Sequence, residues 1–198
     1  THLPNDSYLL LITASYAAEG YNLRDDWFGS DIRKVPSRKA RFEEHELLRD
    51  VQSTDLLQAI TLLHTRERKL GDLKAGKTGK QVRPVSAKRA SVLDLPLEAY
   101  QRWADQVEKG FVEAARFLLK ECFYSRRELP YATQLVPLAA VMTLLGNRWR
   151  EPRIHHKLSR WFWSGVLGEL YGGAVETRIA LDLEELMNWF EDDGEIPR

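Results

Sequence analysis

The pattern of apolar and polar positions is clearest between residues 129 and 190. Three helices are predicted there: an apolar helix that ends at Gly146, an aromatic helix that ends near Gly172, and an amphipathic helix after them. The last helix has apolar side chains three and four positions apart, which places them on one helical face. This stripe consists of Val175, Ile179, Leu183, Leu186, Met187 and Phe190.

Helical spacing also runs through the earlier part of the chain. Asp94 and Pro96 begin the longest predicted helix, whose apolar positions recur as far as Leu118. Before it, we predict a helix closed by Gly20, a connector over 21–40, and amphipathic helices over 41–51 and 54–63. The long helix is therefore expected to form the central strut.

Periodicity disappears over residues 66–89, where nine lysines and arginines face only Glu67 and Asp72. This composition predicts a basic loop. The whole pattern predicts an all-α fold: a single multi-helix domain of about six or seven helices, with one long central helix and a basic loop. A division into two lobes within 66–94 is the alternative.

Composition narrows the class of protein. Of 198 residues, 29 are Lys or Arg and 29 are Asp or Glu, so no overall basic excess points to nucleic acid. The single cysteine, Cys122, excludes an internal disulfide and fits a cytoplasmic protein. No apolar run is long enough to span a bilayer. Because the sequence starts without methionine and stops just after a helix, we expect one helical domain, 1–198, from a larger multidomain protein.

Gly71, Gly76, Lys77 and Thr78 match the spacing of a phosphate-binding P-loop. A working P-loop leaves a β-strand and opens a helix, so that backbone N–H groups face the phosphates. Here a helical pattern precedes the motif, and Pro84 follows it without a helical stripe. A P-loop NTPase is therefore an alternative that the sequence context disfavours on both sides.

Other enzyme chemistry has little support in the sequence. His155 and His156 are adjacent and point about 100° apart on a helix, whereas metal-binding pairs prefer a separation of four. Cys122 lacks an activating neighbour, and no nucleophile elbow occurs. We therefore predict no catalytic residue, no metal and no cofactor in this chain.

Two sets of basic residues are candidate nucleic-acid contacts, because such groups neutralise phosphates. One lies in or beside the basic loop: Lys74, Lys77, Lys80, Arg83, Lys88 and Arg89. The other is interleaved with tryptophans, whose rings stack on bases when exposed: Arg148, Arg150, Arg153, Lys157 and Arg160. Alternatively, the charges of the loop set serve only solubility. In the second set, the basic residues would then form the solvated face of a helix whose Trp161 lies in the core.

Four blocks of the sequence resemble, in order, the helical region of GmrSD-type proteins, the family with domain of unknown function 262. They are LLQAITLL at 56–63, the stretch from AKRASVLDL to EAARFL at 87–118, LPYATQLVPLAA at 129–140, and KLSRWFWSGVLGELYGGAVETRIALDL at 157–183. In that family this region follows a ParB-like nucleotide-hydrolysing domain and often precedes an HNH nuclease. The resemblance implies a non-catalytic connecting domain of a restriction or anti-phage protein.

Within these blocks, Gln134, Glu176 and Arg178 are polar residues among apolar neighbours. We interpret Glu176 as a helix-start residue, whose carboxylate complements the dipole, and Arg178 as the partner of a buried carboxylate. In the functional alternative, Arg178 reaches a phosphate or a neighbouring domain. The expected partners are other domains of the same polypeptide and DNA, and the alternative function is a purely structural scaffold.

Overall fold

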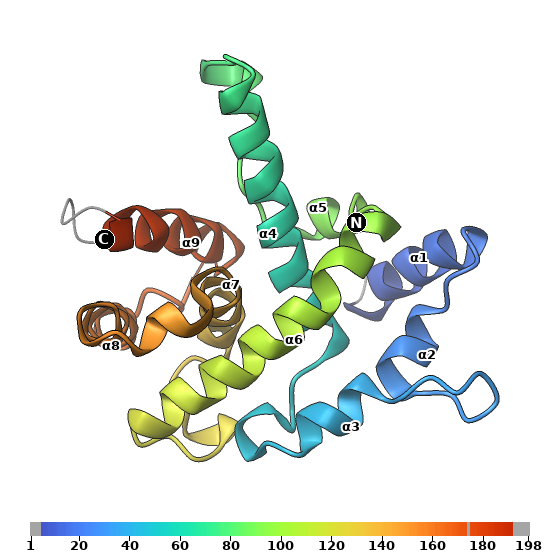
Figure 1. Ribbon diagram of the computed structural model, residues 1–198, viewed down its shortest axis with the longest axis horizontal. Coiled ribbons are helices and arrows are strands. Elements are labelled where there is room, and N and C mark those ends of the chain that lie inside the picture. Colours follow the sequence, from blue (N-terminus) through green and yellow to red (C-terminus); the bar gives the residue numbers. More distant parts are fainter. Residues whose placement is uncertain (1–4, 174, 192–198) are drawn as a thin grey trace.

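The computed structural model describes residues 5–173 and 175–191, and helices make up most of it (Figure 1). Across these residues there is no β-strand, and an isolated bridge joins Ser30 to Val35. The all-α prediction is confirmed. The nine helices of the described residues are α1 Asn5–Ala18, α2 Leu23–Phe28, α3 Arg38–Glu43, α4 Ser53–Lys74, α5 Arg89–Leu93, α6 Leu97–Lys120, α7 Leu135–Leu145, α8 Pro152–Leu167 and α9 Val175–Glu191.

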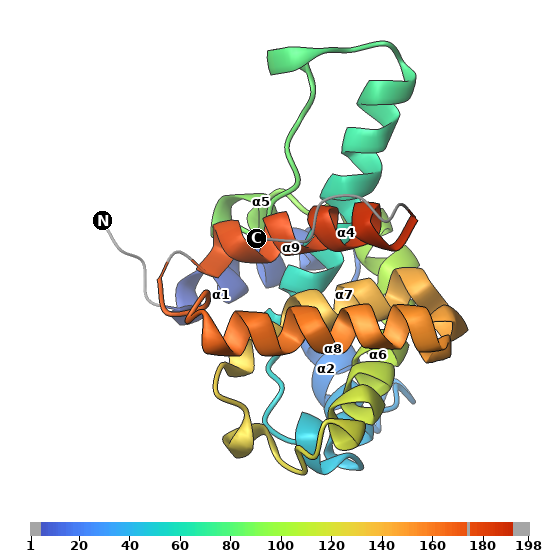
Figure 2. The same ribbon diagram turned by 90° about the vertical axis from the view of Figure 1, so that its left-hand side faces the viewer.

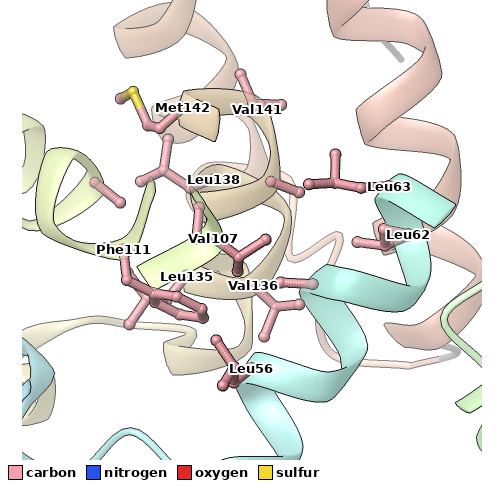
Figure 3. Packing of buried hydrophobic residues seen from close by; sticks show 14 of the residues in the cluster. Leu56, Leu62, Leu63, Val107, Phe111, Leu135, Val136, Leu138, Val141 and Met142 are labelled. Carbon is pink, nitrogen blue, oxygen red and sulfur yellow. The ribbon is translucent and has the colours of Figure 1, made fainter. Parts of the chain in front are cut away.

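Helix α7 lies at the centre of the molecule, with α4, α6 and α9 packed around it. All of its residues except Thr143 and Leu144 are buried, as expected for a helix that is apolar on every side. Figure 3 shows leucines and valines of α4 and α6 converging on α7. The residues labelled there are Leu56, Leu62, Leu63, Val107, Phe111, Leu135, Val136, Leu138, Val141 and Met142.

The long helix α6 packs closely against α7 because Gly110 has no side chain. A Cβ atom at Gly110 would lie 2.1 Å from Thr143 Oγ1 and 2.4 Å from the Ala139 carbonyl oxygen. One hydrophobic cluster extends from Ile12 to Phe190 and includes residues from both sides of 66–94. The fold is therefore a single multi-helix domain with a continuous core.

Several element boundaries differ from those predicted. The 21–40 connector contains α2, where Asn22 accepts hydrogen bonds from two backbone N–H groups, and α5 is a second additional short helix. The helix predicted over 41–51 is instead α3 followed by the 3-10 turn Glu46–Leu48. The prediction of six or seven helices missed these short elements because a helix of one or two turns has too few positions to show a stripe.

The largest difference concerns residues 66–74, which we predicted as loop and which belong to α4. In Figures 1 and 2 the C-terminal part of α4 and the chain that returns from it project away from the other helices. Because this part of α4 has few neighbours, it needs no apolar stripe. The periodicity that identifies packed helices is therefore missing.

Candidate functional site

We call residues 66–88 the basic arm. It consists of the projecting end of α4, a tight turn, the 3-10 turn Gly79–Gln81 and the returning chain (Figure 2). No acidic residue occurs between Asp72 and Asp94, while Lys or Arg occurs six times in that interval. The arm has eight Lys or Arg and two acidic residues, so it has a net charge of +6 within a chain that is neutral overall.

The end of α4 is fixed by its own backbone. Gly76 has φ +76°, and its N–H donates to the Leu73 carbonyl at 3.0 Å. The N–H of Lys77 donates to the Asp72 carbonyl at 3.1 Å. This pair of bonds, with a left-handed glycine after the helix, is the Schellman arrangement. The chain thus reverses direction at a defined turn.

The carboxylate of Asp72 joins the two sides of the arm. Its Oδ2 accepts the Arg83 Nε–H at 2.8 Å and the Arg83 backbone N–H at 3.1 Å, and its Oδ1 accepts from Arg83 Nη2 and Lys77 Nζ, each at 2.8 Å. The hydrogen bonds from Arg83 and Lys77 lower the pKa of Asp72. The carboxylate therefore stays ionised and holds the returning chain against α4.

The base of the arm has a second attachment and two ion pairs to other helices. Thr65 Oγ1 accepts the Ser86 N–H at 3.1 Å. Glu67 of the arm pairs with Arg102 of α6, and Lys69 pairs with Glu184 of α9. These contacts join the two sides of the arm at its base and connect it to α6 and α9.

The predicted loop cations occupy different places on this arm. Lys74 and Lys80 are exposed at its end, while Lys77 and Arg83 are bound to Asp72 yet keep about half of their side chains exposed. Lys88 is exposed at the base, and Arg89 is partly buried at the start of α5, where it has interactions of its own. The structure thus brings Lys74, Lys77, Lys80 and Arg83 together at one end.

The P-loop alternative fails on geometry. Gly71 lies inside α4, no strand precedes the motif in the described chain, and Thr78 is followed only by a short 3-10 turn. The Lys77 ammonium binds the protein's own Asp72. In the described chain the motif leads into the 3-10 turn Gly79–Gln81 and not into an α-helix, so the arrangement that cradles a nucleotide phosphate is not formed.

The second basic set lies on and before α8, and several of its members are bound to acidic groups. Arg148 pairs with Glu191 at 3.0 Å, and Arg150 pairs with Glu113 at 2.6 Å. Arg153 also has an interaction, and Arg160 is exposed on α8. Part of the positive charge of this set is therefore neutralised within the fold.

Both interpretations of the second basic set are wrong for Lys157. It is neither a surface cation that could contact nucleic acid nor part of a solvated helix face. Its side chain is buried, and Nζ donates to the Trp189 carbonyl at 2.5 Å and lies 5.1 Å from the centre of the Trp189 ring. Trp189 is in the last turn of α9, where carbonyl groups lack helical partners and the helix dipole favours a cation. Lys157 therefore ties α8 to the end of α9.

The tryptophans of this region are mostly structural. Trp149 and Trp161 are buried, and the Trp149 Nε1–H donates to Glu113 at 2.7 Å. Trp163 is 38% exposed, but its Nε1–H donates to Glu121 at 2.8 Å. The rings of Trp149 and Trp161 are thus covered, as the alternative interpretation required for Trp161, whereas Trp163 is partly exposed.

The family-motif residues Gln134 and Arg178 lie in the interior or at its edge. Gln134 is buried and donates from Nε2 to the Phe162 carbonyl at 3.2 Å. A Cβ atom at Gly165 would lie 2.6 Å from Gln134 Nε2, so glycine at that position leaves room for the amide. Glu176 is half-buried in the first turn of α9, which is consistent with a helix-start role.

Arg178 binds a carboxylate that the sequence analysis did not single out. Asp182 is buried one turn further along α9, and it accepts hydrogen bonds from Arg178 and from the hydroxyl of Tyr171. Burial raises the pKa of Asp182, although the hydrogen bonds from Arg178 and Tyr171 act in the opposite direction. The spacing of four between an arginine and an acid within an apolar stripe is the sequence signal for this pair.

His155 and His156 do not form a metal site with any other described residue. His155 packs its ring 5.4 Å from the ring of Phe117 and 6.0 Å from that of Trp149, whereas His156 is exposed. Among the residues described here, no group of three His, Cys, Asp or Glu side chains is placed to hold a metal. Among the described helices, none has the length and hydropathy required to cross a membrane.

Comparisons with known proteins give little further information. No protein-family model matches the chain, and no solved structure matches it. A segment of 41 residues is 37% identical to an uncharacterised protein of Methanocaldococcus jannaschii. That match covers 21% of this chain and 7% of the archaeal protein. The chain therefore matches a small part of a much longer relative whose function is not described.

Proposed function

We propose that this chain is the helical connecting domain of a GmrSD-like DNA-targeting defence protein and that its basic arm contacts duplex DNA. It contributes no catalytic residues and links a nucleotide-hydrolysing domain to a nuclease. The four sequence blocks that resemble the family support the first part of this proposal. The observation that carries the second part is a projecting arm whose end bears four cations, two of which are bound to one buried carboxylate.

A projecting cationic element suits a phosphate backbone better than the region around α8. Lys74 and Lys80 extend from the end of the arm into solvent, with no acidic residue in the surrounding sequence after Asp72. In contrast, Arg148 and Arg150 are bound to Glu191 and Glu113. Since duplex DNA has a high density of negative charge, the arm offers the stronger electrostatic attraction.

The test is binding of a fluorescent DNA duplex of about 20 base pairs, followed by anisotropy over a range of salt concentrations. The full chain is compared with Lys74→Ala/Lys80→Ala and with the control Lys34→Ala/Lys109→Ala, which removes the same charge from exposed positions on the body. We expect affinity to fall with salt. The arm variant should reduce the slope of log K against log salt by about one for each removed contact, and the control should leave it unchanged.

The alternative function, a purely structural scaffold, is favoured by an apolar hollow between α1 and α2. This hollow has a volume of about 210 Å³ and is lined by residues that include Leu10, Trp27 and Phe28. Leu10 is 68% exposed and Phe28 is 57% exposed, so this face resembles a protein-contact surface. Absence of salt-dependent duplex binding would favour the scaffold over the DNA contact.

A further inference from the structure

Asp72 is an acidic residue at the centre of the basic arm, and its position is unusual for a surface ion pair. Its side chain is 3% exposed, whereas those of Lys77 and Arg83 are 44% and 51% exposed. The anion is therefore covered, and the cations that bind it form the outer surface. An approaching phosphate meets the cations first.

We infer that Asp72 is a positioning residue, which holds Lys77 and Arg83 as a preformed cation set for the phosphodiester backbone of duplex DNA. This inference rests on the proposed DNA contact and adds the residue that organises it. The guanidinium of Arg83 has five N–H donors, of which Asp72 takes those at Nε and one at Nη2. Lys77 has three donors and gives one to Asp72. The remaining donors of both side chains are left for phosphate oxygens.

The geometry of the turn explains why positioning is needed. Residues 75–88 contain Gly76 and Gly79, both with positive φ, and an unattached chain of this composition would sample many conformations. Asp72 binds Lys77 just after the turn and Arg83 on the returning chain, so one carboxylate fixes both positions. A binding element that is already ordered loses less conformational freedom on binding.

A positioning role for Asp72 predicts a change in DNA affinity that is opposite in sign to the change expected from charge alone. Asp72→Asn makes the arm one unit more positive, so an arm that attracted DNA only by its charge would bind more tightly. If Asp72 positions the cations, the same substitution frees Lys77 and Arg83 and weakens binding. Glu67→Gln is the matched control, because it removes one negative charge from the same arm without contacting the Asp72 cluster. Its ion pair with Arg102 is about half exposed, so its loss should change the position of the arm little.

The experiment measures the affinity of the full chain for a fluorescent duplex, and its salt slope, for wild type, Asp72→Asn, Glu67→Gln and Arg83→Lys. We expect Asp72→Asn to bind about tenfold more weakly, with a smaller salt slope, and Glu67→Gln to bind equally or slightly more tightly. Arg83→Lys keeps the charge but loses the two-point contact, so it should resemble Asp72→Asn. Because the arm projects from the core, circular dichroism and thermal unfolding should show that the body of each variant is folded.

The outcomes separate this inference from the proposed function. If wild-type protein shows no salt-dependent binding, the DNA contact itself is wrong. If wild type binds, but Asp72→Asn binds as tightly as Glu67→Gln with an equal or larger salt slope, the positioning role is wrong and the arm acts only through its net charge. Unchanged binding by Arg83→Lys would also overturn the positioning role.

Discussion

Arg38 and Asp26 are joined by two parallel hydrogen bonds of 3.0 Å, from Nε to Oδ2 and from Nη2 to Oδ1, where α2, α3 and α6 meet. The buried guanidinium also pairs with Asp105 at 3.0 Å and with Glu108. Both Asp105 and Glu108 are on α6, so one arginine connects three helices. The ion-pair cluster around Arg38 therefore orients the N-terminal elements against the long helix.

Removal of this arginine should destabilise the fold strongly. Arg38→Ala leaves Asp26 without the charge that compensates its partial burial, whereas Glu108 keeps its ion pair with Arg41. We expect a loss of about 3–5 kcal/mol in the free energy of unfolding. Arg33→Ala, which breaks an exposed ion pair with Asp25, should cost at most about 1 kcal/mol. Chemical denaturation of both variants measures the difference, and equal losses would contradict a structural role for the Arg38 cluster.

The same cluster predicts a dependence of stability on pH. Burial alone would raise the pKa of Asp26, but the hydrogen bonds and charge of Arg38, with hydrogen bonds from Tyr100 and Tyr21, leave it below the ordinary value of 3.8. The unfolded chain therefore takes up this proton first as the pH falls. The contribution of Asp26 is fully present above about pH 4 and is lost as the pH falls through the folded pKa.

Denaturant unfolding between pH 7 and pH 2 tests this dependence. Asp26→Asn should be less stable than wild type at pH 7, and the difference between the two should shrink as the pH falls below about 4. A difference that stays constant across this range would show that the ionised carboxylate of Asp26 does not contribute as we describe.

Gly110 should be essential for the contact between α6 and α7. Gly110→Ala places a methyl group against Thr143 and the Ala139 backbone, and the resulting strain should cost about 1–3 kcal/mol or more. The control is Gly71→Ala in the arm, where an added Cβ meets nothing within 4 Å and alanine favours the helix by up to about 1 kcal/mol. The thermal unfolding midpoint should fall for Gly110→Ala, and it should rise or stay unchanged for Gly71→Ala.

The isolated chain should hydrolyse no nucleotide. Lys77 binds Asp72, and Gly71 lies within a helix, so neither is placed as in a nucleotide-binding loop. Phosphate release from ATP and GTP, measured for wild type and Lys77→Ala, should match the buffer background in both. Turnover by wild type that Lys77→Ala abolishes would instead identify a P-loop enzyme.

The sequence predicts the packed helices well because packing creates the pattern used to find them. The stripe from Val175 to Phe190 becomes α9, and the apolar run before Gly146 becomes the central helix α7. The projecting end of α4 was missed because an exposed helix has no apolar stripe. Its visible signal was Gly76, a glycine placed just after a run of good helix formers.

The polar clusters were harder to predict because they depend on residues distant in sequence. Arg38 is 12 residues from Asp26 and 70 from Glu108, and no local pattern indicates that they meet. Lys157 resembled a surface cation until the fold placed it at the C-terminal end of α9. By contrast, the Arg178–Asp182 pair has helical spacing and could have been identified from the sequence.

The proposed contact between the basic arm and duplex DNA can be tested by lysine footprinting. Each lysine of the full chain is acetylated with and without bound duplex, and the rates are compared by mass spectrometry. If the arm binds the duplex, Lys74, Lys77 and Lys80 should be protected, while the acetylation rates of Lys34, Lys109 and Lys120 on the body should not change. Protection at Lys120, which lies beside Trp149 and the second basic set, with none on the arm would contradict it.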